Sequence, residues 1–483
     1  MGTDKVNWLA VLALALTAVL VYSPHFNYIY PLHSDEWHHI AEAKKILEGR
    51  YGKKSLLAFE PGYHVFLAAI AFLNLNLITA YRFLPPLFAL AACSVLYLFV
   101  KRLSASSVAA LFSIVFYASL PTNTNVLGVQ YAVPLTFAVP FMYLCMFFFY
   151  KGFHGDRKSM NRFLITFSTL LIVHPPSALF TFAVAVLYGL ASYASGERQT
   201  TAWKQVAAVA VVLFAMAFIV IYLLGDFKWF LSKVVFNRGW TPLEPSITQS
   251  PYVITLGSMD LAINRFHPAL LFGLTPFLLS LLGMYYASRA GGMRVFQVWV
   301  LFSASLVFLF NIVDFIPIVP YQRAVYYMLV GLVPLAGIGL ERLVRFLDWS
   351  MLRTTAFVLF VVFVTFHGYG GQPPGMETYY LIDDEDYAAG TFLSTQSYGV
   401  ILAPLPISSA LPALTSKDVV ADMVFAGSDW MRADVRRFFA GNCDARAEVI
   451  RKHAVRYIYS PNPLKCKSFK EIYSRGRYIY QVW

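Results

Sequence analysis

Long apolar runs separated by short polar breaks dominate the hydropathy pattern of this chain. Examples are the runs at 8–21, 81–100, 206–224 and 296–313. Each is long enough, or nearly so, to cross a hydrocarbon core that needs about 20 residues. The first run ends without a small-x-small cleavage site, so we expect it to be a retained helix. The pattern predicts a polytopic α-helical membrane protein.

The composition favours the same class. Hydrophobic residues make up 58% of the 483 positions and charged residues only 13%, well below the roughly 25% of a soluble domain. The formal net charge is +12. Most of this excess lies in the polar breaks before residue 376, where basic side chains would face anionic membrane lipids. We therefore expect membrane lipids as partners and no nucleic acid.

The Lys and Arg residues gather in alternate polar breaks, as is typical of cytoplasmic loops. These clusters lie at 101–102, 151–162, 198–204, 289–294 and 342–353. Placing them all inside gives about eleven spans in the plasma membrane, with the N-terminus cytoplasmic and the C-terminal part outside. Counting the apolar stretch at 63–77 as a span would reverse every later loop. We therefore expect that stretch to lie at the outer interface.

A domain boundary is expected near Pro373-Pro374-Gly375. Residues 1–375 would form a transmembrane domain whose first outer loop, 22–79, carries interfacial helices. Residues 376–483 mix short β-rich runs with stretches of helical spacing, which predicts an extracytoplasmic α/β domain. Cys443 and Cys466 both fall in it. An outward location permits a disulfide between them, although two cysteines in one domain need not meet.

A pair of adjacent acids, Asp35 and Glu36, follows the first apolar run. It opens a stretch, 35–47, whose apolar residues have helical spacing and give one apolar face. A carboxylate there could accept a proton from an acceptor hydroxyl or amide, or hold a divalent cation on a leaving phosphate. The alternative for Asp35 is a helix cap, with both acids favourably placed on the helix dipole.

Two histidines, His38 and His39, follow on the same expected helix. Asp35, His38 and His39 are therefore weak candidates for metal ligands. No third ligand at a recognisable spacing follows the two histidines. Adjacent histidines at a membrane interface are more often solvated or hydrogen-bonded, and that alternative stays open.

The order of several short motifs resembles a family of membrane enzymes. The acid pair is followed by FEPGYH at 59–64, IVHPP at 172–176 and PYQR at 320–323. Together they resemble the GT-C membrane glycosyltransferases, which include protein O-mannosyltransferases, the lipid A aminoarabinose transferase and the catalytic subunits of oligosaccharyltransferases. The tail, with SSALPALT at 408–415, is similar to outer domains of archaeal and bacterial members.

The resemblance implies a transferase that uses a polyprenyl-phosphate-linked sugar donor and a glycan, lipid or protein acceptor at the outer face. It assigns Asp35 as base with Glu36 in support, and it places Arg323 on the lipid phosphate. A guanidinium suits phosphate oxygens on physical grounds too, the alternative being a snorkelling side chain. Four further residues are candidates for substrate binding, with structural roles as the alternative for the last three: Tyr321, Glu60, His64 and His174.

The chain also departs from that family. Its second outer loop, 121–133, has no Asp or Glu where many relatives carry a second acid, and Gln130 lies near that position. The WWDYG signature of oligosaccharyltransferases is absent, so asparagine is not supported as acceptor. A cofactor such as Mg²⁺ or Mn²⁺ is compatible with the resemblance, but a metal-independent mechanism gains ground. The rival hypotheses are a transporter or flippase of lipid-linked glycans, disfavoured because the acids cluster outside the spans, and a non-catalytic scaffold for glycan assembly.

Overall fold

The computed structural model describes most of the chain. The described residues are 3–52, 60–120, 128–195, 252–256, 259–263, 272–289, 291–313, 321–347, 353–355, 357–359, 361–362, 380–422 and 428–482. Several predictions fall outside them: the boundary at 373–375, residues 121–127 of the second outer loop, and most of the expected outer loop at 225–266.

The described chain forms two compact units, neither of which is continuous in sequence. A helical unit comprises Met1–Val21, Pro85–Gln130 and Pro134–Gln372. A mixed unit comprises Tyr22–Leu84, Tyr131–Val133 and Pro373–Trp483. The first outer loop therefore belongs to the same compact unit as the C-terminal residues, which no hydropathy pattern indicates. The predicted boundary at 375 stays a prediction.

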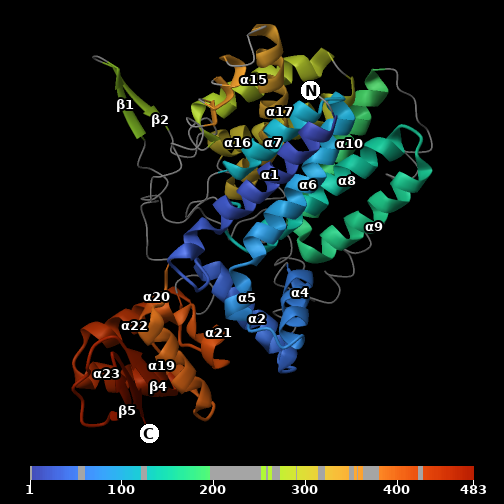
Figure 1. The fold of residues 1–483 in the computed structure, drawn as a ribbon. Coiled ribbons are helices and arrows are strands. Elements are labelled where there is room, and N and C mark those ends of the chain that lie inside the picture. The colour runs from blue at the N-terminus through green and yellow to red at the C-terminus, as the bar shows by residue number, and fades with distance from the viewer. Residues whose placement is uncertain are drawn as a thin grey trace. The chain divides into compact units, whose positions relative to one another are not determined.

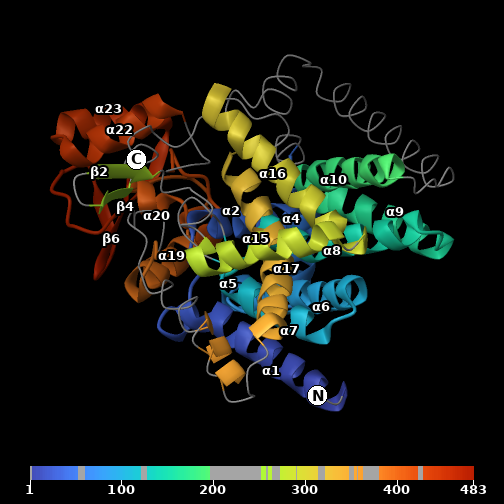
Figure 2. The same ribbon diagram turned by 90° about the horizontal axis from the view of Figure 1, so that it is seen from above.

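The helical unit is built around one enclosed helix, α17 (Tyr321–Leu347). Residues 324–341 of α17 are buried throughout, and α7, α15 and α16 pack against it (Figure 2). The other α-helices among the described residues of the unit are α1 (Thr3–Tyr22), α6 (Leu84–Ser104), α7 (Ser107–Ala118), α8 (Pro134–Phe153), α9 (Arg157–Val173), α10 (Pro175–Ala194), α15 (Leu274–Arg289) and α16 (Arg294–Val313). A short antiparallel hairpin, β1 (Tyr252–Leu256) and β2 (Met259–Ile263), precedes α15.

Glycines allow the backbones of α15 and α17 to approach closely. A Cβ on Gly339 of α17 would lie 1.9 Å from the carbonyl oxygen of Leu279, and one on Gly283 of α15 would lie 1.9 Å from that of Leu335. Neither position can hold a larger residue without moving the helices apart. Small residues at helix contacts are a common means of packing inside membranes, where apolar burial alone does not drive association.

Five of the described helical stretches are long and apolar enough to cross a membrane. They are Trp8–Phe26, Leu77–Ser104, Pro134–Phe153, Pro175–Ala194 and Arg323–Leu347. The predicted total of about eleven spans stays a prediction. Helix α4 (Pro61–Phe72) has 12 residues, which at about 1.5 Å each is too short for a hydrocarbon core of about 30 Å. Its length fits the expected interfacial helix.

The C-terminal part of the mixed unit is the predicted α/β domain. Its sheet has the order β3-β4-β6-β5, in which β3 and β4 are parallel and the other pairs antiparallel. Figure 1 shows the domain in orange to red, with β4 and β5 labelled. The strands are β3 (Val400–Leu402), β4 (Val455–Ser460), β5 (Lys470–Arg475) and β6 (Arg477–Gln481). The helices are α19 (Asp384–Thr395), α20 (Leu405–Ser408), α21 (Leu411–Thr415), α22 (Asp429–Ala440) and α23 (Cys443–His453). Cys443 and Cys466 form a disulfide, whereas Cys93 and Cys145 are free and buried.

Within the mixed unit, the segment after α1 is bound to the beginning of the C-terminal part. The hydroxyl of Tyr28 donates to the carbonyl oxygen of Ile382 at 2.9 Å, and that of Tyr30 donates to Asp384 at 2.7 Å. The N–H of Tyr380 donates to the carbonyl oxygen of Leu32 at 3.0 Å. These contacts lead directly into α2 (Ser34–Leu47), which packs against α4 and α21.

Candidate functional site

Asp35 lies in the first turn of α2 and does not cap it. The cap is His33, whose Nδ1 accepts a hydrogen bond from the N–H of Asp35 at 3.2 Å. Burial lowers the pKa of His33, which keeps this nitrogen available as an acceptor. The Asp35 side chain retains 22% of its exposure. Because His33 does the capping, the Asp35 carboxylate is left in the first turn, with one oxygen 3.5 Å from Nδ1 of His33.

Glu36, the neighbouring acid, is fully buried. Its Oε2 accepts hydrogen bonds from the N–H groups of Leu32 at 2.6 Å and His33 at 3.1 Å, and its Oε1 accepts one from Ala132 at 2.7 Å. Burial raises the pKa of Glu36 to about 8, against the opposing effect of these three donors. Both oxygens are thus bonded to backbone, so the side chain positions the loop around α2.

Ala132 is also held through its carbonyl oxygen, which belongs to the next peptide group. The carbonyl oxygen of Ala132 accepts hydrogen bonds from Tyr63 at 2.7 Å and from Tyr81, and the two hydroxyls lie 2.9 Å apart. The ring of Tyr131 stacks on that of His33, with centroids 5.5 Å apart. The segment Tyr131–Val133, at the end of the expected second outer loop, is therefore fixed at the start of α2.

A second cluster joins α2 to α4. His39 Nδ1 lies 2.9 Å from His64 Nε2, and His39 Nε2 lies 3.8 Å from a carboxylate oxygen of Glu60. The hydroxyl of Tyr51 lies 2.7 Å from His64 Nδ1. Both histidines are buried. Burial, with a further contribution from His38, lowers the pKa of His64 to about 3, so this imidazole is neutral at physiological pH.

His38 belongs to a different set of charges. Burial lowers its pKa, while the carboxylates of Glu42, Asp35 and Asp422 act in the opposite direction. Asp422 comes from the C-terminal part of the chain. It was not among the sequence candidates, because nothing in its local pattern distinguishes it from other acids of the tail.

In the helical unit, His174 is a helix cap. Its Nδ1 accepts from the N–H of Ser177 at 3.3 Å and lies 2.6 Å from the Ser177 hydroxyl, which in turn lies 2.7 Å from the hydroxyl of Tyr327. Burial and the nearby guanidinium of Arg323 hold the pKa of His174 well below its usual range. Arg323 is half-buried in the first turn of α17. The side chain of Tyr321 lies outside the described residues.

The sequence candidates therefore fall into two groups. Asp35, Glu36, His38, His39, Glu60 and His64 come together in the mixed unit, and Arg323 and His174 come together in the helical unit. Sequence reasoning missed Tyr63 and Tyr81, and it missed the N–H and carbonyl groups of Ala132. The FEPGYH motif contains one of them, Tyr63, but its hydroxyl bond to Ala132 spans 69 residues and leaves no local signal.

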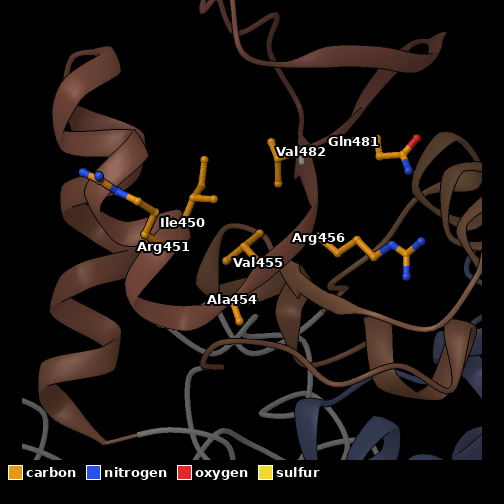
Figure 3. Close-up of a pocket in the computed structure, with 7 residues that line it drawn as sticks. All are labelled: Ile450, Arg451, Ala454, Val455, Arg456, Gln481 and Val482. Atoms are coloured by element: carbon orange, nitrogen blue, oxygen red, sulfur yellow. The ribbon is translucent and has the colours of Figure 1, made fainter.

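A surface pocket of about 400 Å³ lies on the α/β domain, between the end of α23, the start of β4 and the end of β6. Two arginines, Arg451 and Arg456, line it. Figure 3 shows their guanidinium groups pointing away from each other, so they do not converge on a common anion. None of the predicted site residues lines this pocket.

The sequence matches no protein-family model and no curated protein. Solved structures with a similar fold include the following two. ArnT from Cupriavidus metallidurans, solved bound to undecaprenyl phosphate, matches with a TM-score of 0.57 and 13% identity over 99% of this chain and 98% of its own. An oligosaccharyltransferase of Archaeoglobus fulgidus, solved with zinc and sulfate, matches with a TM-score of 0.53 and 13% identity over 94% of this chain and 68% of its own.

The chain shares its fold with these two proteins. The resemblance inferred from the motifs is thus confirmed for the architecture, which combines an α-helical membrane part with a small C-terminal sheet domain. The apolar helices and this fold together make it an integral membrane protein. At 13% identity the likeness concerns the fold alone.

Proposed function

We propose that this protein is a membrane glycosyltransferase. It transfers a sugar from a polyprenyl-phosphate-linked donor to a glycan, lipid or protein acceptor on the outer face of the plasma membrane. The observation that carries the proposal is the shared fold, which extends over 99% of the chain to a protein solved with undecaprenyl phosphate bound. The acid in the first turn of α2 supports it independently.

The proposed reaction is a displacement at the anomeric carbon. The acceptor oxygen forms a bond to that carbon, the bond between the carbon and the phosphate oxygen breaks, and polyprenyl phosphate leaves with the bonding electrons. The acceptor proton must pass to a base. We assign this role to Asp35, because its carboxylate is partly exposed and is released from capping by His33.

Glu36 takes a positioning role in this mechanism. Its side chain is fully buried and its two oxygens are directed at three backbone N–H groups, so it is not presented to an acceptor molecule. It fixes the segment Tyr131–Val133 against the helix that carries Asp35. Glu36 thus supports Asp35 by fixing the backbone around α2 and does not exchange a proton with the acceptor.

On the donor side we assign the lipid phosphate to Arg323, whose planar guanidinium matches phosphate oxygens. His174 lies close enough to Arg323 to act on it electrostatically and is itself held by Ser177. We keep Tyr321, Glu60, His64 and His174 as candidates for contact with substrate or for its support. The proposed orientation has the N-terminus in the cytoplasm and the α/β domain outside. A divalent cation is the proposed cofactor.

The test is release of polyprenyl phosphate by the full-length protein in detergent. Polyprenyl-phosphate sugars extracted from host membranes, with an acceptor fraction from the same membranes, serve as substrates. Wild type should release undecaprenyl phosphate, and Asp35→Asn should lose nearly all turnover while it still binds undecaprenyl phosphate in native mass spectrometry. Glu48→Gln, an exposed acid just beyond the end of α2, is the matched control and should behave as wild type.

Other outcomes would remove the proposal. A flippase would move the labelled lipid across a proteoliposome membrane with its sugar bond intact. A scaffold would neither cleave the donor nor move it. Wild-type turnover in Asp35→Asn would show that the base lies elsewhere.

A further inference from the structure

His39 on α2 and the pair Glu60 and His64 at the start of α4 bring three metal-ligating side chains together. One ligand atom of each lies within 4.8 Å of those of the other two. A search of the described residues for three or more histidines, cysteines or acids with ligand atoms this close together finds this group. We propose that these three residues bind one divalent transition-metal ion, with Zn²⁺ as the first choice. The assignment does not depend on glycosyl transfer.

The donor set decides the class of ion. Two imidazole nitrogens and one carboxylate are ligands that suit Zn²⁺ and its neighbours, whereas Mg²⁺ and Ca²⁺ take oxygen ligands. The Mg²⁺ or Mn²⁺ expected from the resemblance therefore fits this cluster less well than Zn²⁺. Three protein ligands also leave a fourth tetrahedral position for water or another ligand. The sequence candidates grouped His39 with Asp35 and His38, whereas the described contacts group it with Glu60 and His64.

The spacing of the two imidazoles is close to what one ion requires. Zn–N bonds of about 2.05 Å at a tetrahedral angle place two nitrogens about 3.3 Å apart. His39 Nδ1 and His64 Nε2 lie 2.9 Å apart, so the rings need to separate by only a few tenths of an ångström. Glu60 is half-buried, and its carboxylate lies 3.8 Å from the far nitrogen of His39.

The surroundings complete the arrangement. A ligating histidine usually donates its second N–H to an oxygen, which fixes its tautomer. The hydroxyl oxygen of Tyr51 lies 2.7 Å from His64 Nδ1 and can accept a hydrogen bond from it, and in that tautomer His64 Nε2, 2.9 Å from His39 Nδ1, is the nitrogen that would bind the ion. The ion would tie α2 to α4, and His39 lies one helical turn from Asp35 on α2. It would thereby hold the helix that carries the proposed base.

Without an ion, the same distances describe a hydrogen-bond relay from His39 through His64 to Tyr51. The test is the metal content of the full-length protein, purified in detergent without chelators and measured by plasma mass spectrometry. We expect about one zinc per chain. After removal of metal with 1,10-phenanthroline, added Zn²⁺ should raise Tm, and Co²⁺ should give the visible absorption of a tetrahedral site.

Variants separate the two interpretations. Glu60→Gln, at a half-buried position that should tolerate the change, and His64→Gln should each bind Zn²⁺ at least about 10-fold more weakly, since even outer partners contribute about 10–100-fold. Tyr51→Phe should weaken binding by about 10–100-fold and leave Co²⁺ absorption in place. The matched control is His38→Gln, the adjacent imidazole, which should keep its metal.

Three results would overturn the assignment. They are wild-type protein without bound metal and without a Tm response to Zn²⁺, unchanged affinity in Glu60→Gln, or loss of metal in His38→Gln but not in His64→Gln. Because Glu60 does not contribute to the buried core, the Tm of metal-free Glu60→Gln should equal that of metal-free wild type. A fall in that Tm would show that Glu60→Gln has a folding defect. The Tyr51→Phe variant would then test the metal site: weaker binding with the Co²⁺ absorption retained supports it, and no Co²⁺ absorption contradicts it.

Discussion

Glu36 Oε1 accepts a hydrogen bond from the backbone N–H of Ala132 at 2.7 Å, although 96 residues separate them. The carbonyl oxygen of the same residue, Ala132, accepts from two tyrosines. Both polar backbone groups of one residue are thus held by side chains of the segment Tyr22–Leu84. This arrangement gives the acid pair two different physical roles, with Glu36 buried in structure and Asp35 left partly exposed.

Glu36→Gln should destabilise the protein. The amide can place its oxygen toward Leu32 and His33, but its NH₂ then faces the N–H of Ala132, and a buried donor loses its acceptor. Such a loss costs about 1–3 kcal/mol. Thermal unfolding in detergent should show a lower Tm, while Glu48→Gln at the exposed end of α2 should change the free energy by less than about 0.5 kcal/mol. Equal Tm values for both variants would show that the hydrogen bond between Glu36 and the N–H of Ala132 does not stabilise the fold.

The two tyrosines should show coupling. Tyr63→Phe and Tyr81→Phe each remove one donor and leave the other on the Ala132 oxygen, so each should cost about 0.5–1.5 kcal/mol. The double variant leaves a buried carbonyl without either hydroxyl and should cost more than the sum. A double-mutant cycle on unfolding free energies should give a coupling of about 0.5–3 kcal/mol. Strict additivity would mean that the hydroxyls act independently of Ala132.

Much of the architecture could be predicted from local pattern. The helix that begins within FEPGYH and the α/β tail follow from apolar periodicity and turn residues, which act over a few positions. The stretches of helical spacing expected in the tail are observed as helices, for example Cys443–His453. Long apolar runs also gave the membrane class, because a bilayer leaves few other solutions.

The functional grouping could not be predicted in the same way. Glu36 looked like a partner of Asp35 because the two are adjacent, yet its role is set by Ala132. His39 looked like a partner of His38, yet consecutive helix positions point in different directions, and His39 instead meets His64 on another helix. These contacts join residues 25 to 96 positions apart and leave no periodic trace in a single sequence.

Acid should weaken the fold through His64. Burial lowers its pKa from 6.5 to about 3 in the folded state, so below pH 6.5 the unfolded chain binds a proton that the folded chain does not. Stability from this group is therefore lost as pH falls, by about 1.4 kcal/mol per pH unit below 6.5. Glu36 acts in the opposite direction, because its raised pKa of about 8 costs stability as pH rises from 4.5 to 8.

The difference in unfolding free energy between wild type and His64→Gln isolates the pH-dependent contribution of His64. With EDTA present to exclude metal, the stability advantage of wild type should shrink by about 1 kcal/mol between pH 7 and pH 5.5. Denaturant titrations at the two pH values provide the measurement, with the exposed His154→Gln as the control. An advantage that stays constant over this range would show that His64 is protonated alike in both states.

The α/β domain is proposed to lie outside the cell. Lys467 and Lys470 are exposed on it, near the Cys443–Cys466 disulfide. A membrane-impermeant amine reagent should therefore modify both lysines on intact cells. Lys158, exposed in a predicted cytoplasmic break, should react only after lysis. Peptide mass spectrometry reads both positions in one sample, and the reverse pattern would invert the topology.

Arg323 is proposed to hold the donor phosphate, so Arg323→Lys should impair function although the charge remains. A lysine offers a point charge in place of a planar fork. Loss of one charge-assisted contact costs about 1.5–3 kcal/mol, or about one to two factors of ten. The loss should appear in donor affinity if the phosphate is held equally throughout, and in turnover if the contact strengthens as the phosphate leaves. A snorkelling arginine predicts instead that lysine substitutes freely and that Arg323→Ala alters stability more than catalysis. Donor dependence of both variants in one detergent preparation separates these outcomes, and unchanged kinetics in Arg323→Ala would remove Arg323 from the site.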